Sequence, residues 1–313
     1  MSHSLRLGID LGGTTAKVGV VDERAQVLHA ISVPTPMDFS QAADAMAAAV
    51  HEVAALSGCT VQDFPFAGAG VPSMINPRTG RMVFANNTGW HDAPMREALE
   101  QRLGIPVHLA NDADCALLAE AQAGAAQGAD HALMITLGTG VGSAIILNGH
   151  LFTGGDGMGM EAGHLPLVAG GYPCTCGARG CLEAYASATG LAALAREELQ
   201  QVQHSALHVP DAELTGRTIF AAANQGDAAA IRIIDRYCAL LAQGLGGLIT
   251  VFRPQVVIVG GGISHAGAPL FDRLHALVPQ FVFAHEQIGT PDIRPAALGN
   301  EAGIVGAAFL DRA

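Results

Sequence analysis

Four side chains of the kinds that bind zinc are concentrated in one short stretch of the chain. They are His164, Cys174, Cys176 and Cys181, with the spacing His-x9-Cys-x-Cys-x4-Cys. One imidazole and three thiolates complete a tetrahedral zinc site and leave no open position, so the metal is expected to be structural. Any fold of this chain must bring these four groups together.

Disulfides are the competing interpretation of this cluster, but three cysteines leave an odd thiol. The other cysteines stand alone in apolar segments, as buried thiols do in a reducing cytoplasm; they are Cys59, Cys115 and Cys238. The sequence therefore favours zinc.

A strand, a turn of Gly and Thr residues, and a second strand occur in the same order twice. The first copy has alternating apolar residues over 5–11, the turn Gly12-Gly13-Thr14-Thr15 and a strand over 16–21. The second has strands over 133–137 and 141–147 around Gly138-Thr139-Gly140, and a hairpin turn at Asn148-Gly149. Such turns can present backbone N–H groups to phosphate oxygens, although purely structural hairpins have the same composition. An internal duplication and two unrelated hairpins both remain open.

The apolar periodicity predicts further elements. Ser40 is expected to cap a helix whose buried face includes Met46, Val50, Val53 and Leu56. Residues 227–252 are expected to form one long helix that ends before Pro254. A buried strand over 256–259 leads into three glycines, and residues 301–310 predict a final helix rich in small residues.

Length and charge limit the function. A chain of 313 residues is long enough for two domains. Its net charge of −12 and the lack of a Lys/Arg cluster argue against nucleic acid or an anionic membrane as a partner. Residues 1–11 alternate like a strand rather than a secretion signal, and no apolar run predicts a membrane span. These features predict a cytoplasmic protein.

The pair Asn111-Asp112 follows a short apolar segment, 106–109, and precedes a predicted helix. An Asn or Asp at this position is most often a helix N-cap. A carboxylate at the carboxyl end of a strand can also face a cleft and act as a base. The local sequence by itself favours the cap.

Several of these stretches together resemble one known family. The runs DLGGTTAK (10–17), LGTGVG (137–142) and VIVGGGIS (257–264), together with the His/Cys segment ending in Gly-Cys-Leu-Glu, resemble the ROK family of bacterial sugar kinases and related repressors. The resemblance implies an α/β, actin-like (ribonuclease H-like) ATPase fold with two domains around Mg²⁺-ATP and a sugar. The expected domains are 1–112, with a C-terminal helix over 299–313 packing back on it, and 113–298, which includes the zinc loop.

The resemblance also implies roles for individual residues. Asp112 would be the catalytic base. The sugar would be bound by Gly70, Asn87, Asn111, Glu161, His164 and Glu183. ATP would be bound by Asp10, Gly12, Gly13, Thr14, Thr15, Gly138, Thr139, Gly140, Gly261 and Gly262. Without the family motif, Glu161 and Glu183 would be taken for ordinary surface carboxylates. Asn87-Thr88-Gly89-Trp90 differs at one position from the Asn-Leu-Gly-Trp of related glucose kinases, and Trp90 could equally be a packing residue.

The implied activity is ATP-dependent phosphorylation of the 6-hydroxyl of a hexose, with glucose as the first expectation. N-acetylmannosamine, fructose and mannose are alternatives, and a catalytically silent sugar sensor is a less favoured one. The family's repressors have an N-terminal DNA-binding module, for which a first strand starting near residue 5 leaves no room. A homodimer is expected from the family alone.

Overall fold

The computed structural model describes residues 5–85 and 88–313. The chain divides into two compact units. The first comprises the described parts of residues 1–132, 144–160 and 297–313, and the second comprises 133–143 and 161–296. The predicted domain boundary after residue 112 stays a prediction. The mixed α/β architecture agrees with the predicted fold class.

The first unit is built on a five-stranded sheet with the order β3-β2-β1-β4-β8. Its strands are β1 (Arg6–Leu11), β2 (Thr15–Val21), β3 (Val27–Pro34), β4 (Ala67–Val71) and β8 (Val107–Asn111). β1 is antiparallel to β2 and parallel to β4, which is parallel to β8. Leu7, Ile9 and Leu11 are buried, so the alternation over 5–11 correctly predicted β1. A smaller sheet contains β5 (Ile75–Asn76), β6 (Arg81–Ala85) and β7 (Trp90–Ala93).

The helices of the first unit are α1 (Phe39–Leu56), α2 (Met95–Leu103), α3 (Asp112–Ala123) and α10 (Ala302–Ala308). The cap predicted for α1 was wrong. Asp38, not Ser40, caps this helix, since the Asp38 carboxylate accepts the Gln41 N–H at 2.9 Å. Ser40 lies in the first turn, where its hydroxyl accepts a hydrogen bond from Arg102 at 3.0 Å. Leu56, expected on the buried face, is exposed because it ends the helix.

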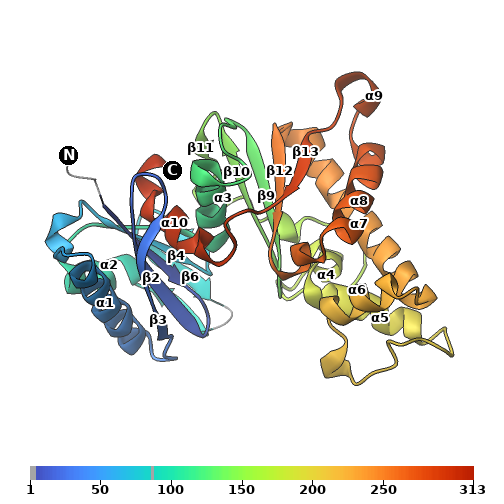
Figure 1. Cartoon of the computed structure of the whole chain (residues 1–313), viewed down its shortest axis with the longest axis horizontal. Coiled ribbons are helices and arrows are strands. Elements are labelled where there is room, and N and C mark those ends of the chain that lie inside the picture. Colours follow the sequence, from blue (N-terminus) through green and yellow to red (C-terminus); the bar gives the residue numbers. More distant parts are fainter. Residues whose placement is uncertain (1–4, 86–87) are drawn as a thin grey trace. The chain divides into compact units, whose positions relative to one another are not determined.

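Helix α10 rests directly on the backbone of the sheet (Figure 1). A Cβ at Gly8 in β1 would lie 2.0 Å from the Ile304 carbonyl oxygen, and one at Gly68 in β4 would lie 1.7 Å from that of Ala307. Only glycine at both positions permits this approach. The helix also packs closely along α3, so the C-terminal segment becomes part of the core of the first unit.

The second sheet has the order β11-β10-β9-β12-β13. Its strands are β9 (Ala132–Leu137), β10 (Val141–Leu147), β11 (His150–Leu151), β12 (Val256–Gly260) and β13 (Asp292–Pro295). The predicted Asn148-Gly149 turn is confirmed, with φ of 54° and 79° at its two residues. Strand-turn-strand hairpins thus occur at both predicted places.

The helices of the second unit are α4 (Glu183–Ala186), α5 (Ala188–Leu199), α6 (Gly216–Asn224), α7 (Ala228–Phe252), α8 (Ala268–Leu277) and α9 (His285–Ile288). α7 matches the predicted long helix to within one residue. Asp227 caps its first turn by accepting the Ala230 N–H at 2.9 Å. Within residues 5–85 and 88–313, no helix is both long and apolar enough to cross a bilayer.

One buried carboxylate joins α3 to the chain that leads into α10. Glu120 has no exposed surface. One of its oxygens accepts the N–H groups of Ala297 and Leu298, at 2.8 and 2.9 Å, and the other accepts the Ala125 N–H at 2.7 Å. Residue 297 is also where the chain re-enters the first unit. Glu120 therefore fixes the start of the C-terminal segment.

The variant Glu120→Gln should lower the free energy of unfolding by about 2–4 kcal/mol, because an amide nitrogen would face backbone donors that now bind a carboxylate oxygen. Urea unfolding followed by circular dichroism measures the change. The matched control is Glu52→Gln, an exposed position on α1. A loss no larger than that of the control would show that these three hydrogen bonds do not stabilise the fold.

Candidate functional site

Three of the predicted site residues lie side by side at one edge of the first sheet. The β1–β4 register pairs Asp10 with Gly70, and the β4–β8 register pairs Val71 with Asn111. All three strands are parallel, so their carboxyl ends meet at this edge, where ligands bind in open α/β sheets. The first Gly/Thr turn follows β1 at the same edge.

The structure is compatible with both interpretations of the Asn111-Asp112 pair, a helix cap and an accessible carboxylate. Asn111 caps α3, since its side-chain oxygen accepts the Ala113 N–H at 2.8 Å. Its amide nitrogen donates to the Ser73 carbonyl at 3.4 Å. Asp112, the first residue of α3, is exposed, and one of its oxygens accepts the same Ala113 N–H at 2.9 Å. The helix N-terminus favours the ionised form of this carboxylate, and an ionised carboxylate is the form that can act as a general base.

Asp10 is a partly buried carboxylate at this edge. Burial raises its pKa, and the Lys17 ammonium on β2 opposes the shift. Lys17 also donates to the Asn300 carbonyl at 3.2 Å. A Cβ at Gly303, in α10, would lie 2.3 Å from the Asp10 carboxyl carbon. The start of α10 thus encloses one side of Asp10.

Two hydrogen bonds of Gly12 fix the shape of the first turn. The Gly12 N–H donates to the Thr15 carbonyl at 3.0 Å, and the Thr35 hydroxyl donates to the Gly12 carbonyl at 2.9 Å. Thr14 and Thr15 are exposed, and Gly13 is partly exposed. These residues remain accessible to a phosphate, as predicted binding residues must be.

The second turn lines a cavity in the second unit with a volume of about 780 Å³. Gly138, Thr139 and Gly262 contribute to it, whereas Gly140 and Gly261 do not line it. A Cβ at Gly261 would lie 2.5 Å from the Leu137 carbonyl oxygen, so this glycine lets β12 and β9 approach.

Other residues of this cavity were missed by the sequence analysis. They come mainly from α6 and from the turn after β12, and include Ala188, Thr215, Arg217, Phe220, Asn224, Ile263 and His265. The mixture of a ring, aliphatic groups and hydrogen-bonding side chains suits a nucleoside. The start of α6, which carries several of these residues, could have been predicted from the sequence. Thr215 and Thr218 have the spacing of a capping box, and they form one in the structure.

The four predicted metal ligands are brought together in the second unit. Their ligand atoms all lie within 4.8 Å of one another. Cys176 Sγ and Cys181 Sγ are 3.7 Å apart, and Cys174 Sγ is 3.6 Å from His164 Nδ1. Tetrahedral coordination with zinc–sulfur bonds of about 2.3 Å would place the sulfur atoms about 3.8 Å apart. The side chains therefore fit a tetrahedral metal ion.

Two acidic residues flank this cluster. Partial burial of its carboxyl group raises the pKa of Glu161, with His164 opposing the shift and Glu183 adding to it. Glu183 binds both the cluster and the second turn: one oxygen accepts the Thr175 hydroxyl at 3.1 Å, and the other accepts the Val141 N–H at 3.0 Å. Because Glu183 raises the pKa of Glu161, the two carboxylates are close enough to repel each other.

Trp90 is a packing residue. Its ring is 7% exposed, its Nε1 donates to the Met37 carbonyl at 2.7 Å, and it meets Phe39 edge to face with 5.4 Å between ring centres. The predicted sugar ligand Asn87 lies outside the described residues.

A family model described as the ROK family matches residues 6–313. The chain is 37% identical to a glucokinase of Thermotoga maritima over 309 residues, which is 97% of this chain and 96% of that protein. It is 31% identical to an N-acetyl-D-glucosamine kinase of Pasteurella multocida over 98% of this chain and 99% of that one. A ROK family glucokinase from Streptomyces griseus, solved in complex with glucose and AMPPNP, has a TM-score of 0.82 and 34% identity, and 98% of each chain is covered.

The variant Asp10→Asn should be more stable than the unchanged protein at pH 7. The folded-state pKa of Asp10 is raised above 3.8. The neutral carboxyl therefore makes its full contribution to stability below that pH, and this contribution is lost as the buried carboxyl ionises at higher pH. The gain should shrink to nothing below about pH 4. Thermal unfolding of both proteins across this pH range measures it.

Asp63→Asn supplies a control of opposite sign. The Thr60 N–H and hydroxyl lower the pKa of Asp63, so this variant should lose stability at pH 7 and regain parity as the pH falls through that lowered pKa. If Asp10→Asn were less stable than the unchanged protein at pH 7, ionisation of Asp10 would not lower the free energy of unfolding, and the raised pKa would be contradicted.

Proposed function

The chain belongs to the ROK family, and on that premise we propose that it is an ATP-dependent sugar kinase that phosphorylates the 6-hydroxyl of glucose. The observation that carries the proposal is the placing of an exposed Asp112 beside Asn111, at the sheet edge that also holds Asp10. The glucokinase relatives, at 37% identity and nearly full coverage, support glucose as the substrate.

Phosphoryl transfer to a hydroxyl needs an oriented acceptor, a group that takes its proton and stabilisation of the phosphoryl charge. Asp112 is the base. Asn111 positions the sugar, and Gly70, which is buried and whose Cβ would meet Cys115 Sγ at 2.9 Å, would contribute only its backbone. Asp10 would hold the Mg²⁺ that accompanies ATP and offsets the charge of its phosphates, and the first turn would bind phosphate oxygens through its N–H groups and the hydroxyls of Thr14 and Thr15.

The nucleoside is proposed to occupy the cavity of about 780 Å³ in the second unit. Phe220 and Ile263 supply apolar surface for a purine ring, and Asn224 offers both a donor and an acceptor to its edge. Gly138, Thr139 and Gly140 are proposed to face the phosphates, and Gly262 lines the wall near the adenosine. Gly261 acts indirectly, because it lets β12 and β9 approach behind that wall. A polyphosphate donor would make no use of these apolar groups.

The metal of the His/Cys cluster is proposed to be zinc. Three thiolates and an imidazole select zinc over the hard cations that oxygen ligands prefer. His164 turns Nδ1 toward the cluster, which leaves Nε2 available for a sugar hydroxyl. Glu161 and Glu183 are proposed to bind further hydroxyls, and Asn87 is assigned to the sugar by the family motif alone.

Other sugars are the main alternatives. N-acetyl-D-glucosamine kinases are among the relatives. N-acetyl-D-glucosamine is therefore a candidate substrate beside N-acetylmannosamine, mannose and fructose. A silent sensor is disfavoured because Asp112 and both turns are present. We also propose that the protein forms a homodimer, on the basis of the family. A cytoplasmic location is proposed on the basis of the isolated thiols.

Purified protein with Mg²⁺-ATP should release ADP in the presence of glucose and not in its absence. Asp112→Asn should lower kcat by about 10²–10⁴-fold, the usual contribution of a general base, with little change in glucose affinity. A coupled assay for ADP measures both. Asp130→Asn, an exposed position away from this edge, is the control. Near-normal turnover by Asp112→Asn would remove it as the base, and silence with every sugar named above would favour the sensor.

One zinc ion per chain should be found by elemental mass spectrometry. Cys176→Ser should lower the zinc content, because a serine hydroxyl is a poor zinc ligand, whereas Cys59→Ser should not. Glucose affinity measured by calorimetry should fall on removal of the metal with a chelator. A chelated protein with unchanged glucose affinity would refute the role of the metal in sugar binding.

A further inference from the structure

The backbone of the second turn is held by the segment that follows the last metal ligand. The Ala188 N–H donates to the Gly138 carbonyl at 2.8 Å, and the Thr189 hydroxyl donates to the Thr139 carbonyl at 3.3 Å. The Glu183 carboxylate accepts the Val141 N–H at 3.0 Å. Three contacts from α4 and the start of α5 thus set the shape of the turn.

Glu183 is the one of these residues that also binds the metal loop. Its second oxygen accepts the Thr175 hydroxyl at 3.1 Å and lies 3.6 Å from Cys174 Sγ. A Cβ at Gly140 would lie 2.5 Å from the first oxygen, so the glycine allows the carboxylate to reach the turn. Both oxygens of one side chain are therefore occupied, one by each loop.

The chain gives this carboxylate little freedom. Cys181 is fully buried and only two residues before Glu183. Leu182, between them, is also buried, and its N–H donates to the Leu165 carbonyl at 2.9 Å. Any group that holds Cys174 and Cys181 therefore also fixes Glu183.

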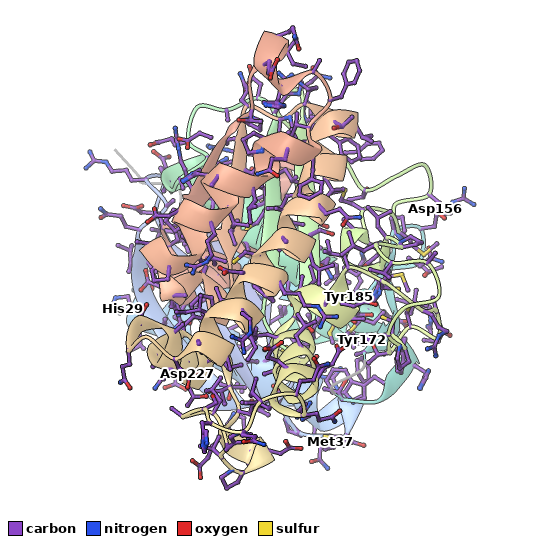
Figure 2. All side chains as sticks on the ribbon, turned by 90° about the vertical axis from the view of Figure 1, so that its right-hand side faces the viewer. His29, Met37, Asp156, Tyr172, Tyr185 and Asp227 are labelled. Atoms are coloured by element: carbon purple, nitrogen blue, oxygen red, sulfur yellow. The ribbon has the colours of Figure 1, made fainter. Side chains whose placement is uncertain are left out.

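The far side of the metal loop is anchored separately. Tyr172 stacks on Tyr185 of α4 with 4.7 Å between ring centres, and the two rings lie together in Figure 2. The Tyr172 N–H donates to the Tyr185 hydroxyl at 2.8 Å, and the Tyr172 hydroxyl donates to Glu197 of α5. Neither Tyr172 nor Glu197 has a hydrogen bond to the second turn among the contacts of the described residues.

We infer that Glu183 is a positioning residue that couples the metal loop to the second phosphate turn, so that the metal site supports nucleotide binding as well as sugar binding. This inference rests on the proposed function for the identity of the turn's ligand. A carboxylate that accepts the Val141 N–H fixes the backbone where the turn joins β10. Loss of the metal would release Thr175 and Glu183 together and loosen the turn.

The direct test is hydrogen exchange of the turn, which needs no substrate. In the zinc-loaded protein, amide exchange of peptides covering 138–141 should be slow. It should become faster in Glu183→Gln, since an amide is a weaker acceptor than a carboxylate, and in the chelated protein. The matched control is Glu197→Gln, which removes a carboxylate on the far side of the same loop. Continued protection of 256–260 in β12, a buried strand of the same unit, shows that the second unit is folded in each sample.

The second measurement is calorimetric titration with the non-hydrolysable analogue AMPPNP and Mg²⁺, without sugar. Glu183→Gln and metal removal should each weaken binding about five- to twentyfold, the effect of losing one charge-assisted hydrogen bond, and the two should not add. Glu197→Gln should bind as the unchanged protein does. Glucose affinity is measured in parallel.

The outcomes separate the inference from the proposed function. Unchanged exchange of the turn in Glu183→Gln, or a loss confined to glucose affinity, overturns the coupling and leaves the kinase proposal standing. An unchanged protein that does not bind AMPPNP refutes the kinase proposal, and the exchange data then still decide whether Glu183 couples the two loops.

Discussion

The buried carboxylate of Glu120 is the contact on which the organisation of the first unit depends. The chain leaves this unit and returns to it at residue 297, and Glu120 accepts two of the first N–H groups after that return. Burying a charge is costly, but three short backbone hydrogen bonds compensate for the lost hydration. The segment so placed continues into α10, which can lie on the sheet only because Gly8 and Gly68 have no side chain. The edge formed by β1, β4 and β8 is therefore backed by a helix from the other end of the sequence, and that helix encloses one side of Asp10.

The second unit uses a carboxylate in a similar way. Glu183 binds one backbone N–H of a glycine-rich turn, as Glu120 binds those of a returning segment. The difference is exposure: Glu120 is fully buried, whereas Glu183 is partly accessible and remains able to accept further hydrogen bonds. A fully buried carboxylate stabilises a fold, and a partly exposed one can also meet a ligand. Glu183 is hydrogen-bonded within the fold and partly accessible at the same time.

An acidic protein that binds phosphate must do so without a basic surface. With a net charge of −12, this chain has no field that attracts anions. Two turns of small residues offer accessible threonines instead, namely Thr14, Thr15 and Thr139, and Asp10 can supply a site for Mg²⁺. Lys17 is held near Asp10 and is hydrogen-bonded to Asn300, so it stabilises that carboxylate. This arrangement favours a ligand that arrives with its own divalent cation.

The sequence by itself determined the elements whose information is local. Alternation predicted β1, apolar periodicity predicted α7, and His/Cys spacing predicted a cluster that the fold closes to within 4.8 Å. The motifs also identified the family, because four separate stretches that resemble it occur in one chain. Tertiary structure decided the partners of the carboxylates, since Glu120 and Ala297 meet only when the chain returns. It also decided the walls of the cavity in the second unit and the burial of Trp90. Propensity and periodicity describe neighbours along the chain, whereas a cavity is lined by residues that only packing brings together.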